Sequence, residues 1–175
     1  MTIDTAPNPI LNDVDLETVA ALGAAVADDP TNGHTTWSAS VAWKGAFRTE
    51  ATIRDFAPIP SDEPAALGGG DSAPNPVEQV LAALGNCLAV GYAANASASG
   101  IAIRDLRIDI SGDLDLATFL GLTDGNAGFG AIRAEVHLDA DAGDEEVEAL
   151  HRRVVATSPV GHTLNRAVPL SVELG

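Results

Sequence analysis

Cysteine, lysine and aromatic side chains are scarce in this sequence. Cys87 is the single cysteine among 175 residues, so no disulfide can form within the chain, which excludes a secreted scaffold held together by disulfides. Lys44 is the single lysine, and 9 Lys and Arg residues against 25 Asp and Glu residues give a net charge of −16. A surface this acidic repels nucleic-acid phosphates and anionic lipid headgroups, so we expect no nucleic acid and no membrane among the partners.

Long hydrophobic runs and a targeting segment are also lacking. The longest apolar stretch, residues 80–94, is interrupted by Asn86 and is too short to span a bilayer, which predicts a buried helix. Residues 1–12 lack the basic and apolar regions of a signal peptide, so the expected location is cytoplasmic. With 46% hydrophobic residues, the chain can bury the core of one ordinary domain.

The N-terminal part predicts a short amphipathic helix. Apolar residues recur at helical spacing over residues 14–27, Asp13 is a suitable cap, and Asp28-Asp29-Pro30 is expected to end the helix.

A hairpin is expected next. Residues 37–43 and 47–53 alternate between apolar and polar side chains on either side of Lys44-Gly45, which is typical of two paired strands. Residues 58–73, with several prolines and Gly68-Gly69-Gly70, are expected to form a loop.

The segment from Asn75 to Gly100 predicts a central helix. Asn75 is a good N-cap, Pro76 suits the first helical position, and Glu78 stands three residues after the cap, where a capping box has its acid. The chain is then apolar on nearly all sides until Ala98. A helix with so little polar face is expected in the middle of a structure, covered on most sides.

The second half predicts two strands at residues 106–110 and 132–138, a glycine-rich connection between them, a helix over 144–157 and a closing strand over 168–174. Strands in groups, with helices set apart, indicate an α+β fold with a largely antiparallel sheet. The helix over 144–157 is expected to turn these side chains inward: Val147, Leu150, Val154 and Val155.

Nucleotide, metal and hydrolase sites are poorly supported. The glycines of residues 121–130 precede a strand rather than open a helix, so they do not make a dinucleotide fingerprint. The four histidines lack paired ligand spacing, and we expect no metal and no cofactor. Ser158 and His162 are close in sequence, but the glycines of a nucleophile elbow are missing. Ser158 is expected to cap or end a helix before Pro159.

Cys87 has two interpretations from the residues alone. A lone cysteine in an apolar helix is commonly inert packing, whereas a reactive one needs an Arg, Lys or His from another segment, because it is far from the helix N-terminus. Glu78 lies nine residues earlier, on nearly the opposite side of the helix at about 100° per residue. Unless the helix bends at Gly85, Glu78 fits a capping role better than contact with the thiol.

The pattern as a whole resembles the OsmC/Ohr family. The resemblance covers residues 37–174, so residues 31–175 are expected to form an OsmC-like domain and residues 1–30 an N-terminal helical extension. The stretches that carry the resemblance are Asn75-Pro76-Val77-Glu78, Leu81-Ala82-Ala83-Leu84-Gly85-Asn86-Cys87, Gly100-Ile101, Gly112-Asp113-Leu114-Asp115, Gly128-Phe129 before the strand at Ile132, and Ser158-Pro159-Val160 with Thr163-Leu164.

The resemblance implies an α+β intertwined homodimer, in which antiparallel sheets wrap long central helices. It also implies a reactive cysteine on the central helix, matched by Cys87, that reduces organic hydroperoxides and becomes a sulfenic acid. In the family a second cysteine resolves this acid, while an arginine from the N-terminal sheet and a glutamate at the helix start hold the thiolate. Arg48 is the best match for the arginine, with Arg54 as the alternative, and Glu78 is the match for the glutamate.

Two positions depart from the family pattern. Ser158 stands where the second cysteine belongs, so the disulfide step is closed to this chain. The family's glutamate stands ten residues before the reactive cysteine, a position that is Val77 here, and Glu78 follows one place later.

Two functional hypotheses follow. The first is a one-cysteine organic hydroperoxide reductase in oxidative stress defence, with Cys87 as nucleophile, Arg48 and Glu78 supporting it, and an external thiol as reductant. The second is a non-catalytic dimeric binding protein whose interface pocket holds an apolar small molecule, with Cys87 merely packed.

Overall fold

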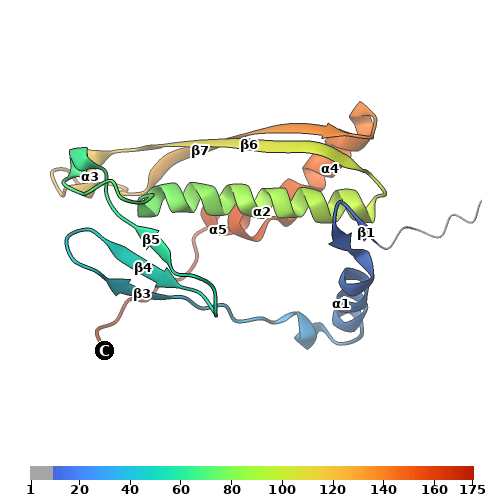
Figure 1. Ribbon diagram of the computed structural model, residues 1–175, viewed down its shortest axis with the longest axis horizontal. Helices are drawn as coiled ribbons and strands as arrows, with labels where there is room; N and C mark the ends of the chain where they lie inside the picture. The colour runs from blue at the N-terminus through green and yellow to red at the C-terminus, as the bar shows by residue number, and fades with distance from the viewer. Residues whose placement is uncertain (1–9) are drawn as a thin grey trace, which may run out of the picture. The chain divides into compact units, whose positions relative to one another are not determined.

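A computed structural model describes residues 10–175 and contains helices with three antiparallel sheets (Figure 1). The expected α+β class is confirmed. The elements divide into two units, one made of the described residues up to Ala20 together with Ala83–Gly175, the other of Ala21–Ala82. The division into an N-terminal extension and a domain from residue 31 stays a prediction.

The unit of Ala21–Ala82 contains a three-stranded sheet in the order β3-β4-β5. The expected hairpin is confirmed: β3 (Ser40–Trp43) pairs with β4 (Thr49–Thr52). The prediction of a loop over residues 58–73 was wrong at its start, because β5 (Ile59–Ser61) pairs there with the other edge of β4. Two prolines near this short strand hide it in the sequence. The short helices η1 (Pro30–Gly33) and η2 (Ala65–Leu67) complete the unit's connections.

Asp62 organises the loop that follows β5. Its side chain is 1% exposed and accepts hydrogen bonds from the backbone N–H groups of Glu63, Gly70 and Ser72 and from the Ser72 hydroxyl, at 2.8 to 3.2 Å. The Ser72 hydroxyl, followed by these N–H groups, holds the pKa of Asp62 below its usual value, although burial acts in the opposite direction. This buried carboxylate therefore ties both ends of the glycine-rich loop together.

The long helix α2 (Pro76–Ala98) begins and ends where the sequence predicts. At its start, the Asn75 N–H donates to Glu78 Oε2 at 2.8 Å and the Glu78 N–H donates to Asn75 Oδ1 at 2.9 Å, a complete capping box. At its end, Gly100 adopts φ +73°, and the N–H of Ile101 bonds the Ala96 carbonyl at 2.9 Å.

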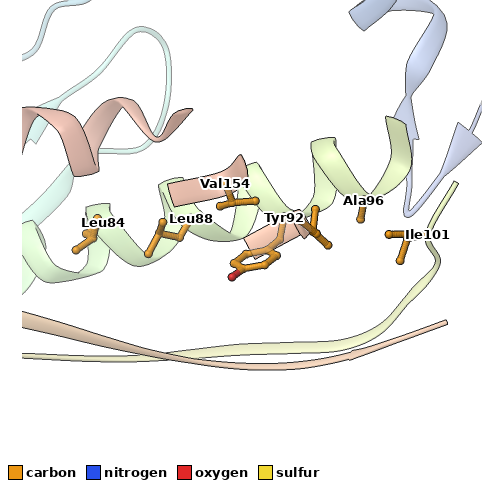
Figure 2. Close-up of a cluster of buried hydrophobic side chains, with 7 residues drawn as sticks. Leu84, Leu88, Tyr92, Ala96, Ile101 and Val154 are labelled. Carbon is orange, nitrogen blue, oxygen red and sulfur yellow. The ribbon is translucent and has the colours of Figure 1, made fainter. Parts of the chain in front are cut away.

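The length of α2 corrects one expectation. The helix has 23 residues and, by length and composition alone, is long and apolar enough to cross a membrane. The helix is longer than the apolar run of residues 80–94 because it continues beyond that run at both ends, and the core helix of a globular protein can have the same length and composition. One side of α2 packs into the core (Figure 2).

The unit containing Ala83–Gly175 is built on a long antiparallel ribbon of β6 (Ile103–Leu114) and β7 (Phe129–Ala140), joined through α3 (Leu116–Phe119). α2 lies along this ribbon (Figure 1). After β7 the chain forms α4 (Asp144–Thr157) and α5 (Pro159–Asn165). The alternation expected in both strands is confirmed, because their apolar residues pack against the core. The buried apolar residues of this core are Leu84, Leu88, Tyr92, Ala96, Ile101, Leu150 and Val154.

Figure 2 shows Leu84, Leu88, Tyr92 and Ala96 at successive turns along one side of α2. The expectation that α2 is covered on most sides was wrong for this single chain, since Val90 is 69% exposed on the other side. Val155 of α4, expected to point inward, is 52% exposed as well. Within one chain, the ribbon and α4 cover one face of α2 only.

The closing strand expected over residues 168–174 is absent from the structure. Leu170, Val172 and Leu174 are 85% exposed or more. A strand needs a partner edge for its backbone hydrogen bonds, and within residues 10–175 none pairs with this segment. The prediction of a strand over these residues was wrong for the described chain, because alternation does not by itself supply an edge to pair with.

The N-terminal segment is fastened to the far end of α2. The Asn12 side chain donates to Ser97 Oγ and to the Ile101 carbonyl, each at 3.0 Å, and accepts from the Ile103 N–H at 2.8 Å. Asn12 lies in the turn between β1 (Ile10–Leu11) and β2 (Val14–Asp15), with φ 53°.

The helix expected over residues 14–27 is present as α1 (Leu16–Asp28). Its cap is Asp15 rather than Asp13, because the Thr18 N–H and hydroxyl both donate to the Asp15 carboxylate. The Thr18 N–H and then its hydroxyl lower the pKa of Asp15. Asp13 instead takes part in the preceding turn, with φ 59°.

Candidate functional site

Cys87 lies in the middle of α2 and is half-buried, so its sulfur is neither sealed in the core nor fully in solvent. Leu84, one turn earlier, is buried, while Asn86 beside it is exposed. The helix therefore sets the sulfur at the border between its packed and its open side. Because Cys87 is mid-helix, the positive end of the helix dipole does not act on it.

Ser158 is the polar group that meets this sulfur. Cys87 Sγ and Ser158 Oγ are 3.3 Å apart, although the two residues are separated by 71 positions in the chain. Ser158 is 5% exposed and stands between α4 and α5. Its Oγ accepts the Gly161 N–H at 3.1 Å and so caps α5, as the sequence predicts.

The fold brings α5 close to α2 at this point. A Cβ atom added at Gly161 would lie 3.9 Å from Leu84 Cδ1 and only 3.0 Å from Ser158 Oγ. Glycine at this position thus leaves room for the Ser158 hydroxyl to stand against the sulfur.

Glu78 is held at the start of α2 rather than beside the thiol. Its carboxylate receives the Asn75 N–H in the capping box, and its own N–H is capped by Asn75. α2 is an unbroken helix through Gly85, so Glu78 and Cys87 project from nearly opposite sides. The role of Glu78 at the reactive sulfur stays a prediction.

The two candidate arginines belong to the unit of Ala21–Ala82. Arg48 is exposed and ends the β3–β4 turn, where its backbone carbonyl accepts the Lys44 N–H at 2.8 Å. Within residues 10–175 its guanidinium forms no ion pair. Arg54 packs over the Phe56 ring, 4.6 Å from the ring centre. Arg54 is therefore already engaged with an aromatic side chain, and Arg48 stays the predicted thiolate partner.

A second group of polar residues lies in the same unit as Cys87 and was missed by sequence reasoning. The Tyr92 hydroxyl hydrogen-bonds His151 Nδ1, and burial raises the pKa of Tyr92. This pair borders an open depression of about 380 Å³. No local pattern links two residues 59 positions apart. The other residues around the depression are Ala134, Val136, Leu138, Asp144, Val147 and Glu148.

The acidic residues and histidines of the described chain form no cluster suited to a metal. Within residues 10–175, no group of three or more His, Cys, Asp or Glu side chains is arranged to hold an ion. The polar group that the structure places within reach of the Cys87 thiol is the Ser158 hydroxyl.

Comparison with solved structures identifies the fold. The OsmC-like protein from Mycoplasma pneumoniae matches with a TM-score of 0.66 at 19% identity, over 75% of this chain and 88% of that one. The organic hydroperoxide resistance protein OsmC from Legionella pneumophila matches with a TM-score of 0.58 at 17% identity, over 75% and 91%. An organic hydroperoxide resistance protein from Elizabethkingia anophelis matches with a TM-score of 0.54 at 17% identity, over 73% and 88%.

None of the curated protein sequences matches this chain. The family model described as OsmC-like protein matches residues 68–173, which include all of α2, the β6–β7 ribbon, α4 and α5. This match spans more than half of the sequence and contains both Cys87 and Ser158. The chain belongs to the OsmC-like protein family.

Proposed function

We propose that this protein is a cysteine-dependent organic hydroperoxide reductase of oxidative stress defence, working as a homodimer in the cytoplasm with an external thiol as reductant. The observation that carries the proposal is the position of Cys87, the single cysteine, half-buried on α2 beside the Ser158 hydroxyl in an OsmC-like chain. Two proteins of the same fold are described as organic hydroperoxide resistance proteins.

The proposed reaction needs only the thiolate of Cys87 and two co-substrates. The thiolate attacks one oxygen of the hydroperoxide; the S–O bond forms, the O–O bond breaks, and the alkoxide leaves as an alcohol after taking up a proton. The sulfur is now a sulfenic acid, oxidised by two electrons. One external thiol displaces water from it and forms a mixed disulfide, and a second thiol releases Cys87 and leaves as a disulfide.

Arg48 and Glu78 have supporting roles in this proposal. A guanidinium near sulfur favours the thiolate, and Arg48 has no competing carboxylate within the described residues. Glu78 acts on the first turn of α2, which it fixes through Asn75. Its contribution is to hold the helix that carries Cys87.

Exposed apolar side chains support the homodimer. More large apolar residues are exposed than buried in the described chain, including Trp43 at 72%, Val90 at 69% and Leu170 at 85%. Apolar surface of this extent on a stable protein marks an interface. We expect sedimentation equilibrium to give twice the chain mass of 17.8 kDa at micromolar concentration. A single-chain mass that does not change with concentration contradicts the dimer.

Replacement of the nucleophile tests the function directly. Cys87→Ser is expected to reduce consumption of cumene hydroperoxide in the presence of dithiothreitol to the level of buffer, because a serine hydroxyl is not ionised at neutral pH. The rate is measured for the wild type and the variant with both cumene hydroperoxide and hydrogen peroxide. We expect the wild type to favour the organic substrate, since Cys87 is half-buried on a largely apolar helix.

Equal rates in the wild type and Cys87→Ser favour the alternative, a dimeric binding protein for an apolar small molecule. One observation supports that alternative: the depression beside Tyr92 and His151 has a largely apolar floor. Binding of an apolar fluorescent probe that is unaffected by Cys87→Ser distinguishes it from the peroxidase.

A further inference from the structure

The hydrogen bonds around Ser158 indicate which atom donates and which accepts in its contact with Cys87. Ser158 Oγ already accepts the Gly161 N–H, which leaves its own O–H to be placed. Within residues 10–175, the Cys87 sulfur is the acceptor within reach of this hydroxyl. Most buried polar side-chain atoms in proteins are hydrogen-bonded, and Ser158 is 5% exposed. Either atom can be the donor in this contact; because the thiol S–H is a weak donor, we infer that the hydroxyl donates and the sulfur accepts.

We propose that Ser158 is a positioning residue that holds the Cys87 sulfur by this O–H···S hydrogen bond, both as the attacking thiolate and as the sulfenic acid that waits for an external thiol. The inference rests on the proposed function and adds to it the control of the intermediate. A hydrogen bond to an ionised acceptor is about twice as strong as a neutral one, so the contact favours the reactive form.

The geometry of α5 fixes the hydroxyl. The hydrogen bond that Ser158 Oγ accepts from the Gly161 N–H fixes the position of the oxygen. Accepting this bond also makes the Ser158 O–H a stronger donor to the Cys87 sulfur. A Cβ at Gly161 would meet Ser158 Oγ at 3.0 Å and Ser158 Cβ at 3.2 Å, both tighter than ordinary contacts. The first turn of α5 thus sets where the hydroxyl stands.

Ser158 holds the sulfenic acid but does not resolve it. Resolution needs a thiol that forms an S–S bond as water leaves, and the Ser158 oxygen offers no such bond. The structure thus assigns resolution to a thiol from outside the chain, with Ser158 remaining on the sulfur until that thiol arrives.

Three substitutions at Ser158 separate the donor from the helix cap. Ser158→Thr keeps both the hydroxyl and the cap, Ser158→Asp keeps a capping acceptor but has no proton to donate at pH 7, and Ser158→Ala loses both. The alkylation rate of Cys87 by iodoacetamide at pH 7 is expected to fall about tenfold in Ser158→Ala, further in Ser158→Asp, and little in Ser158→Thr. After one equivalent of cumene hydroperoxide, dimedone trapping is expected to find a shorter-lived sulfenic acid in Ser158→Ala and Ser158→Asp.

A variant at a second position, Gly161, tests the same hydrogen bond without changing Ser158 itself. Gly161→Ala favours the α5 helix by its propensity but displaces the Ser158 hydroxyl. The helix propensity gained offsets part of the cap that is lost, so we expect slower alkylation of Cys87 with a smaller loss in melting temperature than in Ser158→Ala, which a merely structural role for Ser158 does not produce.

The outcomes are distinct. If Ser158→Ala and Ser158→Asp alkylate like the wild type, or if Ser158→Asp matches the wild type while Ser158→Ala does not, the cap alone matters and the inference is wrong. If alkylation depends on the hydroxyl while the wild type fails to consume hydroperoxide, the hydrogen bond stands and only the proposed function fails.

Discussion

Ser158→Cys is expected to form an intramolecular disulfide with Cys87 when the protein meets an organic hydroperoxide. The wild type cannot form one, because Cys87 has no second cysteine in its chain. Ser158 Oγ stands 3.3 Å from Cys87 Sγ, so a sulfur at that position needs only a small side-chain adjustment to bond. The introduced thiol attacks the sulfenic acid, water leaves, and the S–S bond closes.

The expected change is from no intrachain disulfide to nearly complete conversion by one equivalent of cumene hydroperoxide. Intact mass, free-thiol titration and non-reducing electrophoresis measure it. Thr157→Cys is the matched control, because the Thr157 hydroxyl bonds the Arg153 carbonyl of its own helix and the residue is exposed. Persistence of two free thiols in Ser158→Cys, or disulfide formation in both variants, contradicts the geometry described for Cys87 and Ser158.

Gly69→Ala is expected to be the most damaging single methyl group in the unit of Ala21–Ala82. An added Cβ would lie 1.8 Å from the Glu63 carbonyl oxygen and 2.4 Å from its carbon, atoms of the backbone that no side-chain rotation can move. The loop has to open, which breaks the bonds from Gly70 and Ser72 to Asp62. We expect destabilisation of about 3 kcal/mol or more.

Thermal unfolding and hydrogen exchange of the Gly70 and Ser72 amides measure this loss. Gly23→Ala is the control, since an added Cβ at Gly23 in α1 meets nothing within 4 Å. That variant is expected to gain up to about 1 kcal/mol through helix propensity. Equal melting temperatures for the two variants show that the loop tolerates the methyl group and that its glycine is dispensable.

The ends of α2 and α4 were predictable from the sequence because local chemistry sets them. Asn75, Pro76 and Glu78 form the start of α2 whatever the rest of the chain does, and Gly100 supplies the left-handed residue at its end. The helix over residues 144–157 was predicted with the bounds that α4 has.

Strands were harder to predict because they depend on partners distant in sequence. Ile59–Ser61 has a strand's conformation because β4 offers a free edge, although Pro58 before it and Pro60 within it suggest a loop. Residues 168–174 have the pattern of a strand but find no edge within the described residues. The alternation of apolar and polar residues indicates which side chains share a face of a strand. It does not indicate whether another strand is available to pair with it.

The candidate site was only partly predictable for the same reason. Cys87 was identified from its place in the family pattern, and Ser158 both as the cap after the helix over 144–157 and as the residue that stands where the family has its second cysteine. The contact between them arises from tertiary packing of α5 against α2, across 71 positions in the chain. Capping accounts for Ser158 locally, and the family pattern, which has its second cysteine at this position, was the signal that it lies near Cys87.

Asn12 has a consequence for any shortened version of the protein. Its side chain satisfies the Ile101 carbonyl and the Ile103 amide, the two backbone groups where the chain leaves α2 and enters β6. A truncated protein that keeps only the family-matched residues 68–173 lacks Asn12, so both backbone groups lose this partner and are left to bond water. A version shortened for crystallisation or for fusion to another domain should therefore retain the chain from Ile10 onward. Asn12 lies outside the family-matched region but completes the hydrogen bonding between the end of α2 and the start of β6.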